Sequence, residues 1–110
     1  MQMQKLVDEL GLRVLVGADY LNNEVSGGYV ADLLSCVIAG ANVGNLWITL
    51  QTHVNIVAVA SLKELAGIVV AEGSVVPPAT LEKAEQQGLV VLSSPEPIYE
   101  TVARLVSFGV

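Results

Sequence analysis

Short apolar runs alternate with polar or glycine-containing breaks along this chain, and their spacing predicts a regular succession of strands and helices. Runs rich in valine, isoleucine and leucine that end at a glycine or a polar residue are typical of buried strands. The expected strands are residues 12–17, 24–26, 46–50, 56–60, 68–71 and 89–92. Segments with apolar residues three or four positions apart, or with capping residues at their ends, predict helices. The expected helices are residues 2–10, 33–39, 61–67, 79–87 and 96–107.

Strands that alternate with helices predict an α/β layered domain. The strands at 46–50, 68–71 and 89–92 are continuously apolar, as parallel strands covered on both faces are. The strands at 46–50 and 56–60 lie so close in sequence that an antiparallel hairpin suits them better than a parallel crossover. The expected fold is therefore a mostly parallel, mixed sheet flanked by helices.

The segment at 46–60, LWITLQTHVNIVAVA, is apolar except for one polar break. Thr49, Gln51 and His53 alternate along the chain and would share one face if the strand continued through them. Asn55 suits a tight turn, because asparagine tolerates left-handed backbone geometry. His53 has two interpretations: it hydrogen-bonds backbone groups in a turn, or it serves a ligand as donor or acid/base. These four residues are the first candidate ligand-binding group.

Gly27 and Gly28, followed by Asp32, form the second candidate. Glycines before a helix N-terminus can expose backbone N–H groups to an anion. Asp32 at that N-terminus would compete for the same donors, so a turn with Asp32 as the helix cap is the alternative. A third group is the loop with Asp19, Asn22, Asn23 and Glu24, whose oxygens are of the kind that bind cations.

Composition changes the picture by predicting an exposed apolar surface. The 110 residues fit one domain, and 53% of them are hydrophobic while only 15% are charged. One small core does not absorb so many apolar residues, and the excess is expected on an interaction surface. We expect a homodimer or a complex with a partner protein.

Charge and residue counts exclude several classes of function. The net charge is −6, and the five basic residues are scattered, which disfavours nucleic acid and anionic membrane surfaces. No apolar run is long enough to span a bilayer and the N-terminus lacks the pattern of a signal peptide, so a cytoplasmic location is expected. One histidine and one cysteine predict no metal site, and Cys36 is expected to be a buried thiol on a helix face. No catalytic residues and no cofactor are predicted, because neither a Walker loop nor a G-x-G-x-x-G fingerprint occurs.

Three blocks carry a resemblance to the DRTGG domain family. They are GGYVADLLSCVIAGA at 27–41, LWITLQTHVNIVAVASL at 46–62, and the alternating strands and helices through Leu105. The resemblance covers nearly the whole chain, so residues 1–110 are expected to be one stand-alone DRTGG-like domain, although the string D-R-T-G-G itself is absent. It implies a fold similar to the N-terminal, non-catalytic domain of HPr kinase/phosphorylase.

The resemblance also implies a regulatory or assembly role, since such domains occur beside nucleotide-sensing CBS domains in regulated pyrophosphatases. We expect a non-catalytic homodimer that senses a small ligand such as a nucleotide near Gln51, His53 and Asn55. Stand-alone copies are often encoded beside iron-hydrogenase or electron-transfer genes, so a protein-interaction subunit of a redox enzyme is the first alternative. An enzyme that uses His53 as acid/base is the second. The serine-kinase label that such copies carry is not supported, because the chain has no phosphate-binding loop.

Overall fold

The computed structural model describes residues 1–110 and is built around a five-stranded sheet. Its strands are β1 (Arg13–Val16), β2 (Gly27–Val30), β3 (Asn45–Thr49), β4 (Gly67–Val70) and β5 (Val90–Ser93). They lie in the order β1-β5-β4-β3-β2. The strands β2 to β5 run parallel, and β1 pairs with β5 in the antiparallel sense. The α/β fold with a mostly parallel, mixed sheet is confirmed.

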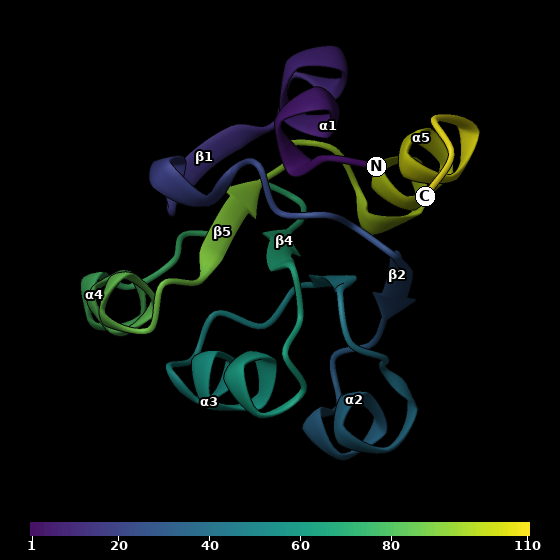
Figure 1. Cartoon of the computed structure of the whole chain (residues 1–110). Helices are drawn as coiled ribbons and strands as arrows, with labels where there is room; N and C mark the ends of the chain where they lie inside the picture. Colours follow the sequence, from purple (N-terminus) through teal and green to yellow (C-terminus); the bar gives the residue numbers. More distant parts are fainter.

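Helices cover both faces of this sheet (Figure 1). Three of them follow successive parallel strands and pack on one face: α2 (Leu34–Gly40), α3 (Asn55–Leu62) and α4 (Pro78–Gln86). The other face carries α1 (Met3–Leu10) and α5 (Ile98–Ser107). Each face has its own apolar cluster, and every residue of β3 and β4 is buried.

The buried indole of Trp47 shows how a polar atom in the core of the sheet finds a hydrogen-bond partner. Trp47 lies in β3, is fully buried, and donates a 2.8 Å hydrogen bond from Nε1 to the carbonyl of Ala31. A buried indole N–H needs such a partner. The bond ties β3 to the segment that follows β2.

The strand expected at 56–60 is wrong, because these residues belong to helix α3. Ile56, Val57, Val59 and Ala60 are buried, so tertiary packing outweighs the β preference of the branched side chains. A short apolar run does not by itself distinguish a strand from a buried helix. The helix makes the connection from β3 to β4 a parallel crossover, and the antiparallel member of the sheet is β1.

The helix expected directly after that strand is also wrong. The helix predicted at 61–67 is absent, since α3 ends at Leu62 and Gly67 begins β4. Glu64, within the range of the expected helix, has a positive φ of 53° and lies outside any helix. Ser61 therefore lies in the last turn of α3 and does not begin a helix of its own.

The turn expected at Gly27 and Gly28 is also wrong. Gly27 and Gly28 are the first residues of β2, and the strand predicted at 24–26 is reduced to an isolated bridge between Glu24 and Gln2. Neither glycine has a positive φ. The side chain that Gly27 lacks would lie 3.3 Å from Nδ2 of Asn45, so a small residue suits this pairing with β3.

Cys36 is exposed, which corrects the buried thiol expected from the sequence. It lies on α2, where Val37 is the buried residue, so the helix turns Cys36 away from the sheet. No helix of the chain has both the length and the apolar character to cross a membrane.

Candidate functional site

The loop from β3 to α3, residues 50–54, lies at the carboxyl end of the parallel strands. The loop from β2 to α2, residues 31–33, lies beside it, because β2 and β3 are parallel neighbours and the amide of Ala31 bonds the carbonyl of Ile48. Open α/β sheets bind ligands at this edge, where loops after several strands converge. These two loops contain or adjoin five of the seven residues in the first two candidate groups of the sequence.

Asp32 and Thr49 form the fixed part of this site. Oδ1 of Asp32 accepts hydrogen bonds of 2.8 Å from the Thr49 hydroxyl and from the backbone amide of Leu50. The Thr49 hydroxyl in turn accepts a 3.0 Å bond from the amide of Gln51. Asp32 therefore shapes the loop after β3, which corrects its expected role as a helix cap: the residue at the cap of α2 is Leu33, which has no side-chain cap bond.

His53 and Asn55 form the second part. Nδ1 of His53 accepts a 3.1 Å hydrogen bond from the backbone amide of Asn55, the first residue of α3. A neutral imidazole that accepts at Nδ1 carries its proton on Nε2. The ring is exposed, and Nε2 has no partner within the protein. One ring nitrogen thus has the structural role of satisfying a helix N–H, while the other stays free to donate.

Five polar groups at this edge have no partner within the protein. They are Oδ2 of Asp32, the side-chain amides of Gln51 and Asn55, the hydroxyl of Thr52 and Nε2 of His53. Together they offer both donors and acceptors, with one negative charge, and neither loop contains a lysine or an arginine. This chemistry suits hydroxyl groups and the edge of a heterocyclic base better than an unscreened phosphate.

Gly27 and Gly28 lie away from this cluster. They pair with Asn45 and Leu46 at the amino ends of β2 and β3, whereas Asp32 and Gln51 follow the carboxyl ends. The two candidate groups of the sequence therefore divide differently in space: Asp32 joins the residues around His53, and the glycines do not.

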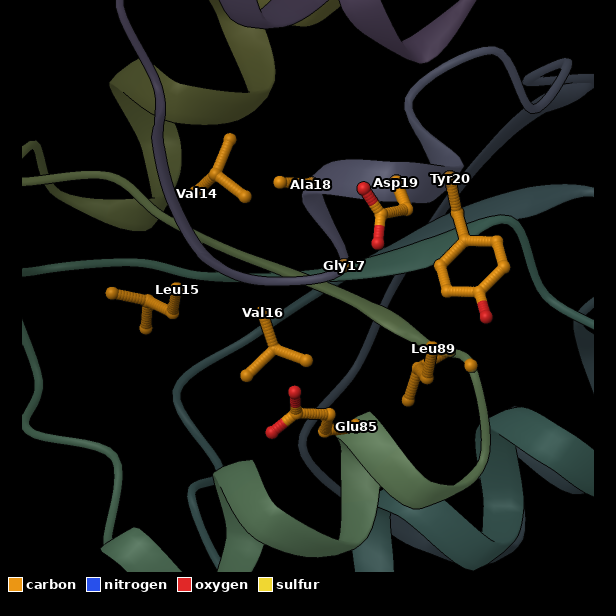
Figure 2. A pocket seen from close by; sticks show the side chains of 10 residues that line it. Val14, Leu15, Val16, Gly17, Ala18, Asp19, Tyr20, Glu85 and Leu89 are labelled. Carbon is orange, nitrogen blue, oxygen red and sulfur yellow. The ribbon is translucent and has the colours of Figure 1, made fainter.

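Two hollows of the surface lie elsewhere, and of the third candidate group of the sequence only Asp19 lines one of them. One, of about 430 Å³, lies between the end of β1, the turn after it and the end of α4 (Figure 2). The other, of about 630 Å³, is an apolar groove between β2 and α5. The polar cluster around His53 is chemically the richer place but lines neither hollow, so a ligand there would bind on an open edge. Only the high proportion of apolar residues in the sequence predicted an exposed apolar surface such as this groove.

No family model matches the chain, and no curated protein matches its sequence. Among solved structures, the chain is similar to the CBS and DRTGG domains of the regulatory region of Clostridium perfringens pyrophosphatase, complexed with its activator diadenosine tetraphosphate. The TM-score is 0.70 at 15% sequence identity. The match covers 96% of this chain and 45% of the other, so this chain spans less than half of that regulatory region. The likeness shows that this chain shares an α/β fold with part of that CBS and DRTGG region.

Proposed function

We propose that this chain is a non-catalytic regulatory domain of the DRTGG type, which binds a small ligand at the carboxyl edge of its sheet. The observation that carries the proposal is the convergence of Asp32, Gln51 and His53, each with an unpartnered polar group, on two adjacent loops at that edge. The fold supports it, because the similar pyrophosphatase region is regulatory and binds a nucleotide activator. The relation to HPr kinase, the single-domain organisation of residues 1–110 and the cytoplasmic location stay predictions.

The ligand we propose is a nucleotide held through its nucleoside part. Oδ2 of Asp32 would accept bonds from ribose hydroxyls, a use that acidic residues have at the same edge of dinucleotide-binding sheets. The amide of Gln51 and Nε2 of His53 would bond the edge of the base. The phosphates would extend into solvent, since neither loop supplies a basic side chain.

Thermal unfolding with added adenosine, AMP, ATP or diadenosine tetraphosphate tests this proposal. A ligand of the folded state raises the free energy of unfolding by about 2.7 kcal/mol at a hundred times its Kd. Gln51→Ala should abolish the rise in Tm, while Gln86→Ala, which removes an exposed amide on α4, should leave it intact. Failure of all four compounds to raise Tm at millimolar concentration would refute nucleotide binding.

We propose further that the domain forms a homodimer through the groove between β2 and α5. Its lining is apolar, with Val30, Tyr99 and Val106 exposed by 47%, 75% and 62%. None of the residues that line it is charged, so two copies with a net charge of −6 can approach there with the least repulsion.

The two edges of the sheet also favour dimerisation at the face that carries this groove. At one edge, β1 carries the exposed Arg13 and a register shift between Val14 and Val16, two features that discourage further strand pairing. At the other edge, β2 carries neither a charge nor a proline and pairs only with β3. A second copy related by a two-fold axis would extend the sheet at β2 and cover the groove.

Light scattering during size-exclusion chromatography measures the assembly. We expect a dimer for the natural sequence, a monomer for Tyr99→Glu, and a dimer for the control Val75→Glu, whose side chain is 86% exposed outside the groove. A monomeric natural protein would refute the homodimer. The same groove would then be the surface to test for the alternative role, docking to an iron-hydrogenase or another electron-transfer protein.

A further inference from the structure

The hollow beside β1 is built by the turn that follows this strand. Residues 17–20 carry the chain from β1 over the start of β5, and the single-turn helix η1 (Ala18–Tyr20) forms one wall. The opposite wall is the last turn of α4 with Glu85, and the floor is apolar, with Val16 and Leu89 (Figure 2). This is the amino edge of the sheet, on the other side from His53, because Val16 pairs with Val91 near the start of β5.

Two glycines hold the walls close together. A Cβ atom on Gly17, whose φ is +96°, would lie only 2.7 Å from Cα of Val90, so the turn rests directly on β5. A Cβ atom on Gly88, whose φ is +67°, would lie 3.4 Å from Cζ of Tyr20. The Tyr20 ring therefore lies against the C-terminal end of α4. The two close contacts, at Gly17 and Gly88, hold the walls of the hollow in fixed positions.

The polar groups of this hollow all favour a cation. Asp19 and Glu85 contribute carboxylates from separate elements, neither of which forms a salt bridge or a hydrogen bond within the protein. In Figure 2 the two carboxylates lie on either side of Gly17 and Val16. The hydroxyl of Tyr20 is also without a partner within the protein, and no basic residue lines the hollow.

Two further features of the hollow also favour a cation. The C-terminal end of α4 carries the negative end of the helix dipole, which favours positive charge nearby. The ring of Tyr20 presents an aromatic surface of the kind that attracts ammonium groups. The cavity of about 430 Å³ falls within the range of sites for small molecules, about 300–1,000 Å³.

We propose that this hollow is a second ligand site, which binds a small organic amine. The ammonium group pairs with the carboxylates of Asp19 and Glu85, and the hydrocarbon part lies on Val16, Leu89 and the ring of Tyr20. A diamine of short chain length fits best, because acidic groups flank an apolar floor. The site is independent of the nucleotide site, since the two lie at opposite edges of the sheet.

Three probes of equal chain length test the chemistry: pentane-1,5-diamine, pentane-1,5-diol and glutarate, each titrated into the isotopically labelled protein and followed by NMR. We expect the diamine to shift the amide signals of residues 14–20 and 85–89, with weaker binding at higher salt. The diol and glutarate should leave these signals in place. Asp19→Asn and Glu85→Gln should each weaken diamine binding about threefold to fivefold, as expected for an ion pair with an exposed carboxylate.

The control is Glu82→Gln, which removes an exposed carboxylate from the same helix outside the hollow. This variant should bind the diamine like the natural protein. Equal weakening in all three variants would show a general attraction between an amine and an acidic protein, and would overturn the proposal. Shifts spread over the surface, or none at these residues, would overturn it as well, whatever the outcome with nucleotides.

Discussion

The hydroxyl of Thr49 donates a 2.8 Å hydrogen bond to Oδ1 of Asp32, and the same carboxylate oxygen accepts the amide of Leu50. The bond joins the last residue of β3 to the loop after β2, the neighbouring strand in the sheet. Thr49 has no exposed surface, so its hydroxyl has no access to water. The shape of the loop that presents Gln51 and His53 therefore depends on a buried hydroxyl and on a carboxylate from another loop.

Replacing Thr49 by valine should lower the free energy of unfolding by about 1–2 kcal/mol. The substitution keeps the shape of the side chain but leaves the amide of Gln51 and the carboxylate of Asp32 without their shared partner. Urea denaturation followed by circular dichroism measures the loss. The control Thr52→Val removes a hydroxyl that has no hydrogen bond within the protein, and a change below about 0.5 kcal/mol is expected. Equal losses in both variants would show that the Asp32 bond contributes nothing.

The pattern of apolar residues was sufficient to predict the helices at both ends, three of the parallel strands and the class of fold. It failed at 56–60, because the exposed side of helix α3 also carries apolar residues, Ala58 and Leu62, so the sequence shows no helical alternation of apolar and polar positions. It failed at Gly27 and Gly28 because a pair of glycines usually indicates a turn, whereas here both lie in the extended strand β2 without a positive φ.

The sequence did not predict the local geometry around the candidate residues. Thr49, Gln51 and His53 were expected on one face of a strand, but β3 ends at Thr49, while Gln51 and His53 lie in the loop that follows and Asn55 begins α3. The role of Asp32 was not predictable, because its partners Thr49 and Leu50 are seventeen and eighteen positions away. Only the pairing of β2 with β3 brings them into contact.

Gly17 should not tolerate alanine. The backbone at Gly17 has a φ of +96°, and the added methyl group would lie 2.7 Å from Cα of Val90, which is backbone and cannot rotate away. We expect Gly17→Ala to cost more than about 3 kcal/mol, from left-handed strain together with overpacking. The control Gly11→Ala has a similar positive φ of 64° but meets no atom within 4 Å, so only about 1 kcal/mol is expected. Thermal unfolding of both variants gives the comparison, and equal shifts in Tm would contradict the close approach to β5.

Cys36 should react with thiol reagents while the protein is folded. Its side chain is exposed on α2, and its carbonyl, rather than its sulfur, accepts the hydrogen bond from the Tyr29 hydroxyl. We expect the rate of reaction with a chromogenic disulfide reagent to be within about tenfold of the rate in urea, because no opening of the fold is required. Cys36→Ser should change the free energy of unfolding by less than about 0.5 kcal/mol. A reaction that occurs only on unfolding would show that the Cys36 thiol is buried, as the sequence predicts.

Two substitutions should distinguish the roles of the two ring nitrogens of His53. His53→Ala removes the acceptor for the Asn55 amide at the start of α3 and should lower the free energy of unfolding by about 0.5–1.5 kcal/mol. His53→Asn places an acceptor near the position of Nδ1, since asparagine side chains commonly bond the amide two residues ahead, and should retain most of that stability.

Asparagine has no atom at the position of Nε2, so His53→Asn should still weaken binding of whichever nucleotide raises the Tm of the natural protein. Denaturation curves and ligand-dependent Tm shifts, measured on the same samples, distinguish the two roles. If His53→Asn is as stable as the natural protein and responds equally to the nucleotide, the role of His53 is confined to capping α3. If His53→Asn and His53→Ala lose the same stability, the bond from Asn55 is not what holds the start of this helix.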